Sequence, residues 1–414
     1  MSEQNNNNIF TKSCLLACSN SVVQYFNYAI FGLSALQLSN NFMPGVEDKN
    51  KLLNFFAAII LTVIARPLGS LFIGHMGDKF GRKLAVTISG LISSIGVLIV
   101  TIVPNYHSIG IIASLLLIFS RMIFLSGLSG EIDGVRLYIS ENISKKRQNF
   151  GNGIVTFSTQ LGALAASFLL YTLASYKDGW RICFVIGGFL GIILTFVRNY
   201  LTETIEFTKS KKSSEYIDIS FTQIIYGQMP LLLKTILISG TIGTMYQFFI
   251  IFLPIYLKLD LSIYLTNYIP VFIASYGFFG IIWGSIADKI GGYSLVRFIS
   301  ILIIITLLCL YFLLEYQLVS LIPYLIISAS SIISGFSVPS QIILKQNINV
   351  GIRYRIFSVG HSLGSLLFST PTCFICTKIA MNYNSLSYAL LYPISMIILG
   401  CCAICSISKS TIRL

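Results

Sequence analysis

Two arginines, Arg66 and Arg121, stand inside long apolar runs of the sequence. A charged side chain in such a run is rare and usually functional, because placing it in lipid costs about 2.5–3.5 kcal/mol on insertion scales. Arg121 lies near the middle of its run, where its guanidinium could hold a carboxylate through two parallel hydrogen bonds. The alternative is an arginine fixed to backbone carbonyls or to a neighbouring helix. For Arg66, which precedes a proline, the structural interpretation is favoured.

Further charged side chains follow Arg121 in the same run. Glu131 stands ten residues later, roughly 15 Å along a helix, which is too far for it to pair with Arg121. Asp133 and Arg136 are three residues apart and can pair on one helix face. We interpret Glu131, Asp133 and Arg136 as part of a gate network at the inner end of the helix. The alternative is a solvated helix end.

Polar and aromatic side chains form a stripe on the first apolar run. Gln24, Asn27 and Tyr28 follow a helical spacing, and Tyr246 with Gln247 offers a comparable pair later in the chain. A buried amide needs a hydrogen-bond partner, so the stripe should face other helices. Tyrosines and amides beside Arg121 suit a small zwitterion or carboxylate, and aromatic faces suit a quaternary ammonium. Hydrogen bonding between helices without a substrate is the alternative.

Several kinds of chemistry are excluded by what the sequence lacks. The nine cysteines and three histidines include the CxxC pair Cys373 and Cys376, but neither a second such pair nor a nearby pair of histidines accompanies it. We therefore expect no metal and no cofactor, with the thiols packing as small apolar groups. No Ser/His/Asp set is found, so we do not expect an enzyme. The phosphate-binding motif GxxxxGK[ST] is absent, so energy must come from solute gradients.

The composition explains where these residues must sit. Apolar residues make up 55% of the chain and charged residues only 10%, against about 25% charged in a soluble domain. The net charge is +13, but the basic residues are spread between apolar runs rather than gathered in one patch, so nucleic-acid binding is excluded. The polar stretch Met1–Asn8 does not resemble a secretory signal. The chain is expected to be an all-α protein of the lipid bilayer.

The apolar runs predict twelve transmembrane helices, each close to the length of about 20 residues that crosses a bilayer. The predicted ranges are 14–36, 52–75, 84–104, 109–135, 152–173, 180–200, 230–256, 268–287, 294–314, 318–343, 355–378 and 386–407. The polar stretch between the sixth and seventh ranges predicts a linker. We therefore divide the chain into an N-terminal six-helix bundle (1–201), a cytoplasmic linker (202–229) and a C-terminal six-helix bundle (230–414).

The basic residues also predict the orientation. If both termini are cytoplasmic, most Lys and Arg residues fall on the cytoplasmic side, as the positive-inside rule requires. The sequence carries no further signal of assembly, and we expect a monomer.

A short motif occurs in the corresponding loop of each bundle. Gly74 to Lys83 follows the second predicted helix, and Gly284 to Gly292 follows the eighth. Two related six-helix halves are the usual architecture of secondary transporters, which expose a site near the middle of the membrane to each side in turn. The repeat predicts pseudo-symmetric bundles and transport by alternating access.

The first of these motifs resembles the signature G-x-x-x-D-[RK]-x-G-R-[RK] of the major facilitator superfamily. The resemblance implies the fold of that superfamily and a gating role for the loop residues Gly74, Asp78, Gly81, Arg82 and, in the second half, Asp288. Gly74 would allow helices to approach closely, Gly81 would make the turn, and Asp78 could face the N-terminus of a neighbouring helix.

Other motifs resemble the metabolite–proton symporter branch of that superfamily. They include Arg66 to Gly69, Arg121 with Gly130-Glu131, Trp180 to Phe184, and Leu201 to Phe207. Within the branch, the proline/betaine carriers are the most similar. The resemblance implies symport of a small organic solute, a proline/betaine-type osmolyte or a small carboxylate, with protons across the cell inner membrane.

The chain departs from this branch where the branch carries acids. Gln24 and Asn27 replace two carboxylates of the first helix, and amides do not titrate. Glu131 is the remaining carboxylate that matches the branch, so it is the expected proton carrier. An uncoupled uniporter or exchanger is the alternative. A transporter-derived sensor is a further one, but it would usually need an added output domain.

Overall fold

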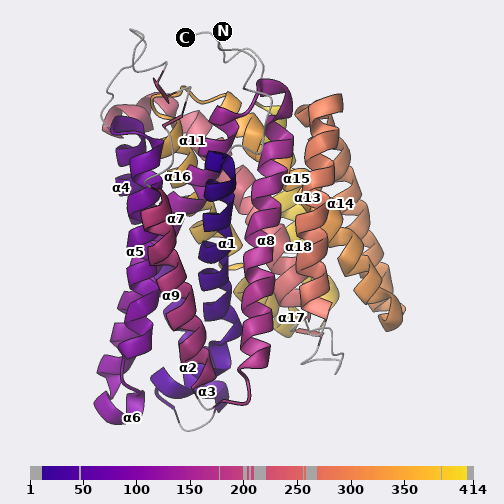
Figure 1. Cartoon of the computed structure of the whole chain (residues 1–414). Helices are drawn as coiled ribbons and strands as arrows, with labels where there is room; N and C mark the ends of the chain where they lie inside the picture. Colours follow the sequence, from indigo (N-terminus) through magenta and orange to yellow (C-terminus); the bar gives the residue numbers. More distant parts are fainter. Residues whose placement is uncertain are drawn as a thin grey trace. The chain divides into compact units, whose positions relative to one another are not determined.

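The computed structural model describes residues 12–45, 48–176, 178–198, 203–204, 207–208, 221–254, 256–257, 268–383 and 385–407. Every regular element within these ranges is helical (Figure 1). A helix satisfies its backbone hydrogen bonds within one segment, so it is one of two structures able to cross lipid. The predicted all-α class is confirmed.

The chain divides into two compact units, and the first comprises Met1–Asn142 with Ser158–Asp218. Within it α5 packs against α7 and α9, α4 against α7, and α1 against α7 and α9. Figure 1 shows α5, α7 and α9 side by side. The helices of this unit are α1 (Lys12–Leu33), α2 (Ala35–Phe42), α3 (Asp48–Val63), α4 (Ala65–Lys79), α5 (Arg82–Ile102), α6 (Tyr106–Ile109), α7 (Ile111–Asn142) and α9 (Gly179–Val197).

The second unit comprises Ile143–Phe157 with Ile219–Leu414. In it α13 and α14 pack against α15, and α11 packs against α16 and α18. Helix α8 (Gln148–Thr172) begins in this unit and ends in the first. The other helices are η1 (Lys145–Arg147), α11 (Phe221–Tyr246), η3 (Gln247–Phe252), α13 (Ile269–Ile290), α14 (Gly292–Glu315), η5 (Val319–Leu321), α15 (Ile322–Gln346), α16 (Arg353–Gly364), η6 (Ser365–Ser369), α17 (Thr372–Asn382), η7 (Leu386–Leu390) and α18 (Leu391–Cys405).

The domains predicted from the sequence differ from these two units in one segment within the N-terminal bundle. Ile143–Phe157 groups with the second unit, whereas the sequence division assigns it to the N-terminal bundle. Of the predicted linker, residues 202, 205–206 and 209–220 lie outside the described residues, and α11 already begins at Phe221. The boundaries 1–201, 202–229 and 230–414 therefore stay a prediction.

Eleven helices of the described chain are long and apolar enough to cross a membrane. Helix α1 reaches 22 residues as well, but its polar stripe lowers its hydropathy. With α1 the described helices match the twelve predicted spans in order. The seventh predicted helix begins at residue 230, whereas α11 begins at Phe221.

The fourth predicted helix ends too early, at residue 135, whereas α7 runs to Asn142. The charged residues after Ser129 suggested a helix end close to solvent. In the structure Glu131, Asp133, Arg136 and Glu141 are all buried. The alternative of a solvated helix end is therefore wrong: the charges lie inside the unit, and the helix continues past them.

Small residues allow the helices of the first unit to approach closely. A Cβ added at Gly96 would lie 2.4 Å from the backbone N of Phe124, and one at Gly127 would lie 2.5 Å from the carbonyl O of Ser89. Helices α4 and α7 meet in the same way, since a Cβ on Gly69 would lie 2.2 Å from the carbonyl O of Ser126. Such contacts are typical of membrane helices, which associate through close packing.

Two helices of the second unit contain π-helical segments. Helix α11 continues into η3 (Gln247–Phe252), and α16 continues into η6 (Ser365–Ser369). In η6 the backbone N–H of Thr370 donates to the carbonyl of Ser365, five residues earlier, at 2.8 Å. Pro371 follows directly. π-helical segments of this kind occur frequently at functional sites.

Candidate functional site

The Arg121 guanidinium lies in the interior of the first unit, on α7. It stacks on the Phe31 ring of α1, with 4.6 Å between the guanidinium carbon and the ring centroid. Phe31 is held in turn by Phe124 and Phe184, whose ring centroids lie 5.4 Å and 4.8 Å away. Tyr28 lies close enough to Arg121 to interact with its charge. The sequence-predicted residues Tyr28 and Arg121 therefore come together.

Gln24 and Asn27 lie on α1, as Tyr28 does, and both are fully buried and bind neighbouring helices. The Ser93 hydroxyl of α5 donates to Gln24 Oε1 at 2.8 Å, and Asn27 Nδ2 donates to the carbonyl of Gly187 on α9 at 3.2 Å. Gln24 Nε2 and Asn27 Oδ1 have no hydrogen-bond partner. Each amide thus fixes α1 to the bundle with one atom and keeps a second polar atom unused.

Tyr25 marks a second charged region of the first unit. It lies within electrostatic range of Arg66, Asp133 and Arg136, and its ring centroid is 6.1 Å from that of Tyr28. Asp133 and Arg136 are both buried on α7. The predicted cluster of Glu131, Asp133 and Arg136 is therefore not a single group, because Glu131 binds Arg198 instead.

Glu131 forms a buried ion pair with Arg198. Arg198 Nη1 donates to Glu131 Oε2 at 2.9 Å, Arg198 Nη2 donates to Glu131 Oε1, and the Ser89 hydroxyl donates to Glu131 Oε2 at 3.2 Å. Glu131 is completely buried and Arg198 is 2% exposed. Sequence analysis missed Arg198, because a basic residue directly after an apolar helix fits the positive-inside rule without a specific partner.

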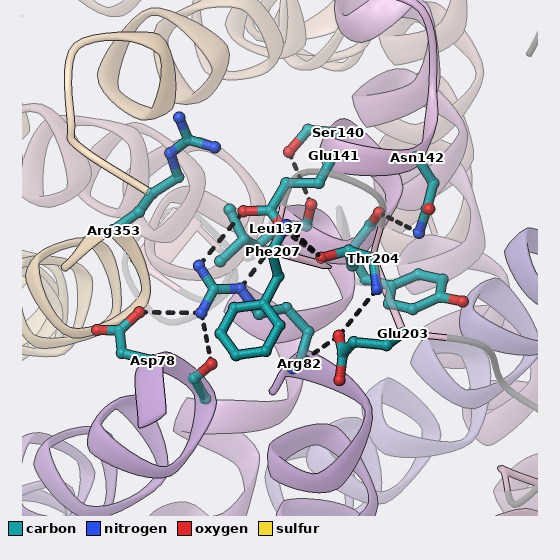
Figure 2. Close-up of polar contacts among 12 residues, drawn as sticks. Asp78, Arg82, Leu137, Ser140, Glu141, Asn142, Glu203, Thr204, Phe207 and Arg353 are labelled. Atoms are coloured by element: carbon teal, nitrogen blue, oxygen red, sulfur yellow. Dashed lines mark hydrogen bonds and ion pairs between the residues drawn. The ribbon is translucent and has the colours of Figure 1, made fainter. Parts of the chain in front are cut away.

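The loop between α4 and α5 is organised around Arg82, which is fully buried. Figure 2 shows its guanidinium between two carboxylates. Arg82 Nη1 donates to Asp78 Oδ1 at 3.0 Å, and Nε and Nη2 donate to Glu141 at 3.4 Å each. The Thr204 hydroxyl donates to Glu141 Oε2 at 2.8 Å. The predicted gate residues Asp78 and Arg82 thus form one network with the end of α7, and Gly74 is buried on α4 beside them.

Gly81 shapes the start of α5. Its φ of 114° is in the region that favours glycine, and the residue precedes the helix as its N-cap. The carboxylate of Glu203 covers this end, accepting from the backbone N–H groups of Arg82 at 3.0 Å and Lys83 at 3.3 Å. A carboxylate at a helix N-terminus is favourable, because it binds unsatisfied N–H groups. Glu203 and Thr204 are absent from the predicted site, although the Leu201–Phe207 motif contained the signal.

Replacing Gly81 with alanine is expected to destabilise the loop by more than backbone strain alone. A Cβ there would lie 2.1 Å from Glu203 Oε2, so the carboxylate must shift and its hydrogen bonds to the start of α5 would weaken. Gly291→Ala is the matched control, because Gly291 has a φ of 93° and no atom within 4 Å of an added Cβ. The Gly291→Ala variant should lose free energy of unfolding only through the left-handed backbone, roughly 1–2 kcal/mol. Thermal unfolding in detergent would measure the stability of both variants. Equal losses of stability would contradict the role of Glu203 in stabilising the start of α5.

The second unit carries the corresponding carboxylate, Asp288, at the end of α13. Asp288 accepts hydrogen bonds from the backbone N–H groups of Asn149 at 3.1 Å and Phe150 at 2.9 Å, and from Asn149 Nδ2 at 2.9 Å. These N–H groups belong to the first turn of α8, where the helix dipole favours negative charge. Asp288 therefore faces a helix N-terminus. Sequence analysis expected this geometry of Asp78 in the first unit, where Asp78 binds Arg82.

Tyr246 and Gln247 also belong to the second unit. Tyr246 ends α11 and packs edge-on against Tyr276, with ring centroids 5.2 Å apart. Gln247 begins the π-helical segment, and the Cys373 thiol donates to its Oε1 at 3.9 Å. The predicted pair thus lies where a helix departs from α geometry.

The helical architecture agrees with a comparison to known families. The family model of the Major Facilitator Superfamily matches residues 16–369, which is most of the chain. The chain belongs to the major facilitator superfamily. The predicted recognition of this superfamily is confirmed.

Two curated relatives in the major facilitator superfamily have related names. The Proline/betaine transporter of Escherichia coli (strain K12) is 25% identical over 381 residues, covering 87% of this chain and 76% of the relative. A Staphylococcus aureus (strain COL) protein provisionally named as a proline/betaine transporter is 28% identical over 291 residues. That match covers 66% of this chain and 61% of the relative, so the chain spans about three fifths of its length.

Solved structures of the major facilitator superfamily share the fold. The proton:xylose symporter XylE superposes with a TM-score of 0.72 at 14% identity, covering 94% of each chain. The transporter FucP, in its outward conformation, gives a TM-score of 0.70 at 11% identity, covering 97% of this chain and all of that one. At these identities the likeness establishes the fold alone.

Proposed function

We propose that this chain is a secondary transporter that moves a small organic solute across the cell inner membrane by alternating access, in symport with protons. The solute would be a proline/betaine-type osmolyte or a small carboxylate. Membership of the major facilitator superfamily and the names of the two relatives support this proposal. The observation that carries it is the buried Arg121 beside Tyr28 and Phe31, a cationic and aromatic group inside a bundle of membrane helices.

The residues proposed to bind the solute are divided between the two units. In the first unit Arg121 would hold an acidic group, with Tyr28 beside it and the unbonded atoms of Gln24 and Asn27 available for further hydrogen bonds. In the second unit Tyr246 and Gln247 would contribute. The gate would comprise Gly74, Asp78, Gly81, Arg82, Asp133, Arg136 and Asp288.

Proton coupling would use the Glu131–Arg198 ion pair. Both partners are buried, so each depends on the other to remain charged. Protonating Glu131 would leave a neutral acid and release the Arg198 guanidinium. A change in protonation would therefore alter the contact between α7 and the end of α9. This is the kind of two-state contact that coupling requires.

A uniporter or exchanger without coupling is the second candidate. Gln24 and Asn27 occupy positions where similar symporters carry acids, and both hold α1 in place through amide hydrogen bonds. Amides do not change charge with pH. If Glu131 stays paired throughout the cycle, no group of the first helix would replace it, and solute would move only down its gradient.

Uptake into proteoliposomes under an inward proton gradient separates these candidates. Proline, glycine betaine and succinate would be supplied as labelled solutes. We expect the parent protein to accumulate a solute above its outside concentration and to lose this ability with a protonophore. Glu131→Gln should allow equilibration without accumulation, because the amide cannot carry the proton. Glu315→Gln is the matched control, since Glu315 is exposed and accepts a hydrogen bond from the Ser387 hydroxyl of the second unit.

The contrary results are distinct from one another. Equilibration by the parent protein, unaffected by a protonophore, would establish the uncoupled candidate. Unchanged accumulation by Glu131→Gln would remove Glu131 from the coupling step. Uptake no faster than that of empty liposomes, for every solute supplied, would contradict transport of these solute classes.

A further inference from the structure

Asn20 of α1 is a buried amide whose side chain has no hydrogen-bond partner. It is 1% exposed, and neither Nδ2 nor Oδ1 has a partner among the residues that the structure describes. Burying a donor or an acceptor without a partner destabilises a protein, so most buried polar groups are paired. An exception inside a bundle of membrane helices therefore indicates a group that is used in another state of the protein.

Asn20 belongs to the same face of α1 as Gln24 and Asn27. The three residues follow the i, i+4, i+7 spacing of one helix face. Gln24 accepts from the Ser93 hydroxyl of α5, and Asn27 donates to the carbonyl of Gly187 on α9. This face is thus directed at α5 and α9. Asn20 faces the same two helices, one turn closer to the start of α1.

Helices α1 and α5 run in the same direction, which determines what lies beside Asn20. Both begin at the end of the unit that carries the α4–α5 loop, and they lead to α2 and α6 at the opposite end (Figure 1). Gln24 of α1 meets Ser93 of α5. One turn back along each helix, roughly 6 Å, leads from Gln24 to Asn20 and from Ser93 to Ser89. Asn20 is therefore level with Ser89.

Ser89 and the residue after it mark the position of the buried ion pair. The Ser89 hydroxyl donates to Glu131 Oε2 at 3.2 Å. A Cβ added at Gly90 would lie 2.3 Å from Arg198 Nη1, and Arg198 is the residue that ends α9. The pair thus lies where α5 and α9 meet, at the level at which Asn20 faces these two helices.

We propose that Asn20 is the second partner of Arg198: when Glu131 takes up a proton, the Arg198 guanidinium moves from the Glu131 carboxylate to Asn20 Oδ1. The inference rests on the proposed proton-coupled transport and names the residue that completes its coupling step. A neutral carboxyl holds a guanidinium less strongly than a carboxylate does, because the contact loses one of its two charges. Asn20 Oδ1 is a buried acceptor that no described residue uses.

The surroundings of Glu131 explain why Arg198 responds to its protonation. Arg198 of α9 supplies the opposing charge that acts on Glu131, and Ser89 of α5 supplies a hydrogen bond. Arg198 Nη1 also donates to the carbonyl of Val86 on α5, a contact that would hold the guanidinium near this helix as it moves. The exchange would replace a contact with α7 by a contact with α1. Because α1 carries the proposed solute residue Tyr28, protonation would reach the solute site.

The stability of Asn20→Leu in two backgrounds tests this exchange without a transport measurement. Leucine keeps the branched shape of asparagine but removes the acceptor, and Glu131→Gln imitates the protonated acid. In the parent, Asn20→Leu should leave the melting temperature of the detergent-solubilised full chain unchanged or raise it, because unpartnered polar atoms are removed. In Glu131→Gln the same substitution should lower the melting temperature, because there it removes the partner of Arg198.

Asn20→Asp provides the reverse test, and it decides the question if the leucine variant fails to fold. In the parent, a second buried acid would share Arg198 with Glu131, so the melting temperature should fall. In Glu131→Gln the new carboxylate would replace the lost one, so the melting temperature should rise. Ser21→Asp is the matched control, because Ser21 is buried and its hydroxyl also lacks a partner within the described chain. Ser21 lies outside the face of α1 that carries Asn20, so this control should shift both backgrounds equally.

Uptake into proteoliposomes then relates the exchange to coupling. Under an inward proton gradient, Asn20→Leu should accumulate solute at least about tenfold more slowly than the parent, the effect of one hydrogen bond to a charged group. The same shift of melting temperature in both backgrounds, for either Asn20 variant, would overturn the exchange. Accumulation by Asn20→Leu at the parent rate would also overturn it. Shifts that depend on the background, in a parent protein that accumulates no solute, would uphold the exchange and contradict proton-coupled transport.

Discussion

Arg198→Ala is expected to destabilise the protein by about 3–5 kcal/mol, because it leaves the Glu131 carboxylate buried without its partner. Glu131 is completely buried, and in this variant the Ser89 hydroxyl would still donate to it. Thermal or chemical denaturation in detergent would measure the loss. Acidification should recover part of the lost stability in this variant, since a protonated carboxyl carries no charge.

The double variant with Glu131→Gln is the decisive control for this pair. Removing the charge of Glu131 should restore much of the stability lost in Arg198→Ala, because a neutral amide costs less to bury than a charge. Arg181→Ala provides a second comparison. The Arg181 side chain is partly exposed, so its removal should reduce the stability by less than Arg198→Ala does. If the double variant is as unstable as Arg198→Ala, the arginine stabilises α9 by packing rather than by pairing.

Asp78→Asn is expected to leave the protein in the membrane but to slow transport by at least about tenfold, the effect of one charge-assisted hydrogen bond. The carboxylate holds Arg82 at 3.0 Å, and Arg82 connects the loop to Glu141 at the end of α7. An amide is almost the same size but carries no charge, so it would weaken one state of the proposed gate without opening a cavity. Initial uptake rates per amount of inserted protein would measure the effect.

A matched exchange elsewhere separates gating from general damage. Asp178→Asn changes a carboxylate that is mostly exposed and lies 3.7 Å from Arg181. Exposed pairs of this kind contribute little, about 0–1 kcal/mol, so uptake should stay near the parent rate. Parent-like uptake by Asp78→Asn as well would remove Asp78 from the gate.

The helical fold could be predicted well, because its signal is repeated along the whole chain. Apolar runs near twenty residues with charges between them leave little choice of structure in lipid. Gly81 was also predictable, since the turn before α5 needs a positive φ. Helix ends near charges were not, as α7 shows: a sequence cannot distinguish a solvated carboxylate from one whose partner lies on another helix.

Partners far apart in the sequence account for what was missed in the candidate site. Arg198 pairs with Glu131 across 67 positions, and Glu203 meets the start of α5 across 121. Charge type and helical spacing find partners within a turn or two, but not on another helix. The same limit applies to Arg121, whose depth could be predicted from its position, whereas its contact with Phe31 and its proximity to Arg66 depended on how α1, α4 and α7 pack.

Each π-helical segment of the second unit contains one residue more per turn than an α-helix would. An α-helix advances about 100° per residue, so a return of η3 or η6 to α geometry would turn the helix beyond it by about that angle. Gln247 starts one such segment and Pro371 follows the other closely. Side chains directed at one neighbour would then be directed at another, with no element unfolding. Rotation of a helix about its own axis is thus available to this unit, in addition to any movement of whole bundles.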